Sequence, residues 1–65
     1  MTPRQFEVLE LLAEGMRDSE IAARLVLSER TVGHHVGAIL RKLDARNRGQ
    51  ATVEAVRLGL VSQDR

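Results

Sequence analysis

The chain of 65 residues has no cysteine, tryptophan or tyrosine, and it holds one proline and one phenylalanine. Without cysteine, neither disulfides nor thiolate metal sites can supplement the core, which must be built from aliphatic side chains. The length predicts a single domain over residues 1–65 with one core. The apolar runs are too short to span a bilayer, and no basic segment followed by an apolar stretch opens the chain. We therefore expect a cytoplasmic protein without membrane insertion.

The sequence also lacks the groupings of residues that support catalysis. It has no nucleophile with a paired base and no glycine-rich phosphate loop. His34 and His35 are adjacent, but neighbouring side chains on a helix point about 100° apart and cannot chelate one ion together. The chain has no third histidine that could join them. We therefore expect no enzyme activity, no metal and no cofactor.

Charge is divided unevenly between the two halves of the chain. Residues 1–29 hold three arginines and six carboxylates, a net charge of −3, whereas residues 30–65 hold seven cations and three carboxylates, a net charge of +4. The second half therefore suits a polyanion such as a nucleic acid. Charge segregation of this size is also common on solvated helices, so the charge alone leaves both interpretations open.

Apolar residues recur at helical spacing along the whole chain and predict an all-α fold of four helices. The first helix is expected to begin after Thr2, with Gln5 completing a capping box, and to end at Gly15. One face of this helix should be buried, with Val8 at its edge. That face consists of Phe6, Leu9, Leu12, Ala13 and Met16.

A second, short helix is predicted over residues 18–25, followed by an apolar turn at Val26 and Leu27. Ser28 is a good N-cap for a third helix over residues 29–43. The apolar stripe of the third helix consists of Val32, Val36, Ile39 and Leu43. Residues 44–49 should form a polar loop. A fourth helix over residues 50–58 follows, with Val53, Ala55, Val56 and Leu58 among its apolar positions.

A short helix, a brief turn and a longer helix with a basic face form the helix-turn-helix arrangement. On a helical wheel, the side opposite the apolar stripe holds Arg30, His34, Gly37 and Arg41, with Gly33 beside them. Cations neutralise phosphates, and small residues let a helix approach the edges of the bases. We therefore predict that the helix of residues 29–43 lies in the major groove of double-stranded DNA.

Five segments occur in an order and spacing typical of one protein family: TPRQ (2–5), LAEG (12–15), EIAARL (20–25), SERTV (28–32) and ILRKL (39–43). Together they resemble the LuxR-type bacterial DNA-binding domain, also called the GerE or NarL type, over nearly the whole chain. The resemblance implies a four-helix bundle. In response regulators, among other proteins, a domain of this type is the effector domain. It also implies sequence-specific binding to double-stranded DNA as a homodimer in transcription control, with RNA polymerase as a further candidate partner. Residues 31–43 are most similar to the domains that end large ATPase transcriptional regulators.

Carried over position by position, the family's base-facing residues fall on Gly33, His34 and Gly37. Family members often have lysine at the first of these positions and a polar or cationic residue at the third, so His34 is left as the base-reader with polar atoms. Two explanations for the glycines stay open: close approach with water-mediated contacts, or readout of DNA shape with help from partner domains. The resemblance further implies dimerisation through the fourth helix. The residues concerned are Val53, Val56 and Arg57, although both valines could instead complete the monomer core.

Phosphate contacts need only a positive charge or a hydrogen-bond donor near the DNA backbone. The residues that meet this requirement are Arg30, Thr31, Arg41, Lys42, Arg46 and Arg48. For Arg46 and Arg48 a solvated loop is the competing interpretation. His35 borders the apolar stripe, and we expect it to pack there with a hydrogen bond to backbone or phosphate. The alternative to DNA binding is a helical protein-interaction module, similar to the promoter-contact domain of sigma factors.

Overall fold

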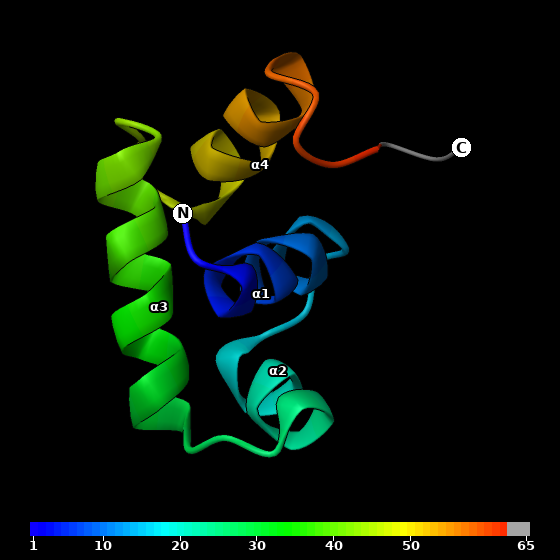
Figure 1. Cartoon of the computed structure of the whole chain (residues 1–65), viewed down its shortest axis with the longest axis vertical. Helices are drawn as coiled ribbons and strands as arrows, with labels where there is room; N and C mark the ends of the chain where they lie inside the picture. The colour runs from blue at the N-terminus through cyan, green and yellow to red at the C-terminus, as the bar shows by residue number, and fades with distance from the viewer. Residues whose placement is uncertain (63–65) are drawn as a thin grey trace.

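Four helices form the part of the computed structural model that is described, residues 1–62 (Figure 1). They are α1 (Pro3–Ala13), α2 (Asp18–Leu25), α3 (Glu29–Lys42) and α4 (Arg48–Arg57). The helix α1 packs against each of the other three, α2 also packs against α3, and α3 also contacts α4. In Figure 1, α2 and α4 lie on opposite sides of α1. The prediction of an all-α, four-helix fold is confirmed.

The predicted signals at both ends of α1 are present. Thr2 Oγ1 accepts a hydrogen bond from the Gln5 N–H at 3.1 Å, and Gln5 Oε1 accepts one from the Thr2 N–H at 3.3 Å. Gly15 has a φ of 91°, in the left-handed region that glycine adopts without a steric penalty. This conformation lets the Met16 N–H donate to the Leu11 carbonyl at 3.2 Å, which closes the helix end.

The core is apolar, and no polar side chain is buried among residues 1–62. The prediction of the buried face of α1 was only partly right. Val8, predicted at its edge, is 0% exposed, whereas Phe6 and Ala13, predicted within it, are only half-buried. The reason is that α1 is contacted by three helices, so its buried arc is not the single face that a wheel assumes. The largest fully buried side chains are Val8, Leu9, Ile21, Val32 and Ile39.

The helix α4 begins two residues earlier than the sequence predicted. Asn47 caps it, because its Oδ1 accepts a hydrogen bond from the Gln50 N–H at 2.8 Å. Arg48 and Gly49 therefore lie in the first turn of α4 and not in the preceding loop. An asparagine cap satisfies backbone donors at a helix start as well as serine does, so this start could have been identified from the sequence.

Val26 ends α2 and forms the turn to α3 in an unfavourable conformation. Its φ is 57° and its ψ is 52°, in the left-handed region, and its side chain is 89% exposed. A β-branched residue rarely adopts this conformation. The turn itself is closed by a hydrogen bond from the Leu27 N–H to the Ala22 carbonyl at 2.9 Å. The exposed side chain of Val26 thus gains little burial to offset the strain of its backbone.

The Val26→Gly variant is expected to be more stable than the parent chain by about 1 kcal/mol. Relief of the left-handed strain, roughly 1–2 kcal/mol, exceeds the added entropy of an unfolded chain with one more glycine. In a domain of this size the gain corresponds to a rise of about 4–8 °C in the melting temperature, measurable by circular dichroism. Val26→Ala, which keeps a Cβ, should gain less. A melting temperature for Val26→Gly equal to or below that of the parent would contradict the strain argument.

Candidate nucleic-acid interface

The start of α3 is fixed by Ser28. Its Oγ accepts a hydrogen bond from the Thr31 N–H at 3.1 Å and donates one to Thr31 Oγ1 at 3.0 Å. Since Thr31 Oγ1 accepts the second bond, its own hydrogen can still donate to an external oxygen. Thr31 is half-buried at the first turn of α3, where free backbone N–H groups and the helix dipole favour an anion.

The buried side of α3 sets the direction in which its other side faces. The predicted stripe is present: Val32 and Ile39 are 0% exposed, Val36 is 7% exposed and Leu43 is 9% exposed. The helix is therefore held against α1, α2 and α4 along its whole length. The opposite side lines one open groove of about 360 Å³. The residues of this groove, called here the reading groove, are Arg30, Gly33, His34, Gly37 and Arg41.

Five predicted site residues are thus brought together on one face of one helix. Arg30, Gly33, His34 and Arg41 are exposed, and Gly37 is half-buried. Among residues 1–62, neither arginine of the reading groove forms an ion pair with a carboxylate. Two arginines without an internal partner make this groove attractive to an anion.

The other two predicted residues of α3 border the reading groove. His35 is half-buried, as expected for a residue beside the apolar stripe, and Lys42 is exposed in the last turn of the helix. A cation in the last turn also interacts favourably with the helix dipole. Lys42 therefore keeps its ammonium group in solvent, where it can approach a phosphate.

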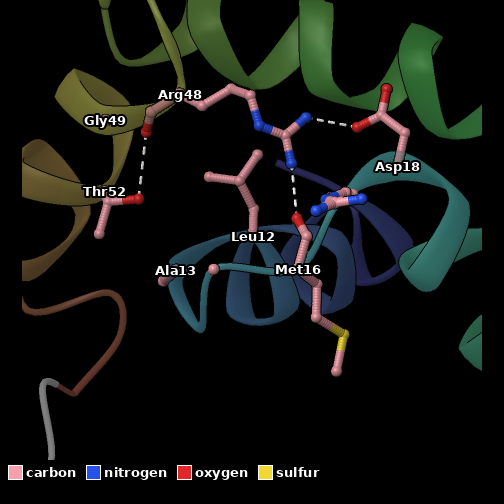
Figure 2. Close-up of a pocket in the computed structure, with 9 residues that line it drawn as sticks. Leu12, Ala13, Met16, Asp18, Arg48, Gly49 and Thr52 are labelled. Atoms are coloured by element: carbon pink, nitrogen blue, oxygen red, sulfur yellow. Dashed lines mark hydrogen bonds and ion pairs between the residues drawn. The ribbon is translucent and has the colours of Figure 1, made fainter.

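Arg46 and Arg48 differ in their surroundings although they lie two residues apart. Arg46 is exposed in the loop before α4, and within residues 1–62 only its backbone N–H is engaged, as a donor to Gln50 Oε1 at 2.6 Å. Arg48 is half-buried, and Figure 2 shows its guanidinium next to Asp18 and Met16. Its Nη2 donates to the Met16 carbonyl at 2.6 Å, and its Nη1 donates to Asp18 Oδ1.

The contacts of Arg48 link α4 to the start of α2, two helices that do not pack directly on each other. They lie beside an open pocket of about 570 Å³, whose other lining residues include Leu12 and Thr52 (Figure 2). The predicted loop position of Arg48 was wrong. Its predicted phosphate contact is disfavoured, because a guanidinium that already bonds to a carboxylate and a carbonyl would have to leave both partners.

The residues predicted for dimerisation lie on the outer side of α4. Val53 is 62% exposed and Val56 is half-buried, so Val53 does not complete the monomer core. Leu58, which follows α4, is also exposed, at 52%. Arg57 donates to Glu54 Oε1 from Nε at 3.1 Å and from Nη2 at 2.7 Å. This hydrogen bonding and the charge of Glu54 raise the pKa of Arg57 above its ordinary value.

Within residues 1–62, no group of three or more His, Asp or Glu side chains is placed to hold a metal ion. No helix in this part of the chain combines the length and the apolar character needed to cross a membrane.

Comparisons with known proteins agree with this arrangement. Residues 1–55 match the family model described as bacterial regulatory proteins, luxR family. The spore germination protein GerE of Bacillus subtilis is 42% identical over 59 residues, which are 91% of this chain and 80% of that protein. A solved structure of the transcription factor GerE superposes with a TM-score of 0.89 at 36% identity, covering 98% of this chain and 96% of the other.

Longer relatives match over a smaller share of their length. The uncharacterized transcriptional regulatory protein YxjL of Bacillus subtilis is 48% identical over 92% of this chain, but the match covers 28% of YxjL. The quorum sensing-dependent transcriptional regulator RpaR of Rhodopseudomonas palustris is 44% identical over 94% of this chain and 25% of its own length. The chain thus spans about a quarter of the length of these two regulators.

Proposed function

Because the chain belongs to the luxR family of bacterial regulatory proteins, we propose that α3 lies in the major groove of double-stranded DNA and reads its sequence. The chain is a helix-turn-helix DNA-binding domain of a transcription regulator. The reading groove carries the finer proposal. Its arginines are unpaired within residues 1–62, and it lies directly opposite the stripe that anchors α3 to the core.

Contacts to phosphates supply most of the affinity in this proposal. Three exposed cations lie along α3 and just beyond it: Arg30 in the first turn, Lys42 in the last turn and Arg46 in the following loop. They can therefore contact the DNA backbone at both walls of the groove. Thr31 and the free N–H groups of the first turn add uncharged donors. Arg48 is left out, because Asp18 and the Met16 carbonyl already bind its guanidinium. In this proposal His34 lies between the two walls and donates a hydrogen bond to the edge of a base.

Selection from a pool of random duplexes tests the proposed function. The 65-residue chain is incubated with duplexes that carry a randomised central segment, and the retained molecules are amplified and sequenced. We expect enrichment of two inverted half-sites about one helical turn apart, as for other dimeric helix-turn-helix proteins. Retention of duplexes without enrichment would contradict sequence reading. Absence of retention at low salt would favour the helical protein-interaction module.

We propose that two copies of the chain meet through the outer side of α4 when they are bound to DNA. Val53 and Val56 form the apolar part of this surface, and Arg57 with Glu54 forms its charged edge. A patch of two valines is small beside stable interfaces, which engage about 20–30 residues a side, so the two half-sites would have to hold the copies together. The same apolar surface is the feature that a protein-interaction module would use.

The Val53→Asp variant is expected to lose cooperative binding while it keeps its fold. Two facing carboxylates would repel each other across the α4 surface. Affinity for a duplex with two half-sites should fall by about 10²-fold or more, because the avidity of the pair is lost. Affinity for a duplex with a single half-site, measured in a parallel titration, should stay unchanged and serves as the control. An equal loss on both duplexes would show that Val53 acts within the monomer and not between copies.

Three finer predictions made from the sequence are also proposals. The similarity of residues 31–43 to domains that end large ATPase regulators would place this domain within such a protein, although none of the three relatives named above is described as an ATPase. Contact with RNA polymerase would follow from a role in activation. A domain that spans residues 1–65 extends ten residues beyond the match to the family model.

A further inference from the structure

The two glycines of the reading groove differ in their surroundings. A Cβ placed on Gly33 would meet no atom within 4 Å outside its own stretch of helix. A Cβ placed on Gly37 would lie 3.7 Å from Nη1 of Arg41. The space beside Gly37 is therefore occupied by the guanidinium of a residue one turn further along α3. Gly33, in contrast, faces open space.

Arg41 reaches this position because its side chain turns back along the helix. Long side chains on a helix lean toward its N-terminus, and four residues of α-helix rise about 6 Å. The guanidinium of Arg41 thus lies near the level of Gly37 and lines the same groove as His34. Within the described part of the chain this guanidinium has no carboxylate partner, so its N–H groups can donate to an external acceptor.

The direction of this side chain matters for what it can contact. A recognition helix places its N-terminal part nearest the base edges, while phosphates line the groove walls. A guanidinium that points toward that part of α3 is directed at bases rather than at a wall. Its planar fork matches the O6 and N7 acceptors of guanine, the commonest specific contact in the major groove.

We propose that Arg41 reads a guanine in each half-site, and that Gly37 is the positioning residue that leaves space for it. The inference rests on the proposed function, since it assumes α3 in the major groove. It changes the role of Arg41 from the phosphate contact predicted from its charge to a specificity-determining contact. Among the family's base-facing positions, only His34 carries polar side-chain atoms, because the other two are glycines. Arg41 adds a second polar base contact to this side of α3.

Random-duplex selection with four variants tests the role of Arg41. Arg41→Ala and Arg41→Lys should both lose the preference for guanine at one position of each half-site, by between about fivefold and 150-fold. The lysine variant keeps the charge but not the fork, so a loss in both variants separates base reading from charge. Lys42→Ala, the matched control, removes the neighbouring charge and should weaken binding to all sequences alike. Arg30→Lys should leave the guanine preference unchanged.

The role of Gly37 is tested by the size of the side chain placed there. Gly37→Ala adds a methyl group at an ordinary contact distance from Arg41 and should keep the guanine preference. Gly37→Leu would occupy the space of the guanidinium, and its preference should fall to that of Arg41→Ala. Combining Gly37→Leu with Arg41→Ala should cause no further loss of preference, because both changes remove the same contact. Additive losses in the double variant would overturn the positioning role.

The outcomes separate the inference from the function on which it rests. If the parent chain enriches a site and Arg41→Ala weakens every sequence by one factor, the base-reading role is overturned while the proposed function stands. If the parent chain enriches no sequence, the proposed function and the inference fail together. Circular dichroism on each variant confirms that any change occurs in a folded domain.

Discussion

Replacement of Val36 by aspartate is expected to unfold the domain. Val36 is 7% exposed in the middle of the stripe that joins α3 to the other helices. A carboxylate there would be buried without a partner, since no polar side chain shares the core within residues 1–62. A domain of 65 residues has about 3–10 kcal/mol of stability in total, and a buried unpaired charge costs several kcal/mol.

Far-UV circular dichroism measures this effect through the loss of helical signal and of the cooperative melting transition. Val53→Asp is the matched control, because it makes the same change at a valine that is 62% exposed on α4. That variant should melt close to the parent chain. A folded Val36→Asp with a parent-like melting temperature would mean that α3 presents a different face to the core, and with it a different face to DNA.

Affinity for DNA should fall about a thousandfold when the salt concentration rises from about 50 to about 200 mM. The estimate takes Arg30, Lys42 and Arg46 from each of two copies, about six phosphate contacts, and a slope of about −0.9 in log affinity per contact. A single copy on one half-site should show about half that slope. Fluorescence anisotropy with a labelled duplex, repeated at several salt concentrations, provides the measurement.

Two variants connect the salt slope to particular cations. Arg46→Ala should reduce the magnitude of the slope by about 0.9 per subunit and weaken all sequences alike. Arg4→Ala is the control, because Arg4 lies on α1 and pairs with Glu7 at 3.1 Å, away from the reading groove. It should leave the slope unchanged. Affinity that does not change with salt would contradict the assignment of phosphate contacts and favour the protein-interaction module.

The order of the helices and the orientation of α3 could be predicted from the sequence because both depend on local signals. Thr2 and Ser28 begin their helices with the hydrogen bonds expected of caps. The strict spacing of Val32, Val36 and Ile39 identified the buried side of α3 and, by exclusion, the reading groove. A helix packed along one side follows its wheel closely.

The remaining features depend on contacts between distant residues, which no local pattern reports. Val8 is buried because three helices surround α1, and the wheel of α1 alone could not show this. Arg48 bonds to Asp18, thirty positions earlier in the chain, and its charge, which predicted a phosphate contact, gave no sign of this pairing. The backward turn of Arg41 over Gly37 is a matter of side-chain conformation, and the sequence assigned Arg41 a phosphate contact from charge alone.

Methylation interference tests most directly whether α3 reads DNA through the major groove. Dimethyl sulfate modifies guanine N7, which faces the major groove, and adenine N3, which faces the minor groove. A selected duplex is modified sparsely, incubated with the chain, and separated into bound and free fractions. We expect N7-methylated guanines within both half-sites to be excluded from the bound fraction, while N3-methylated adenines are bound normally. Exclusion of N3-methylated adenines with no effect of N7 methylation would contradict the placement of α3.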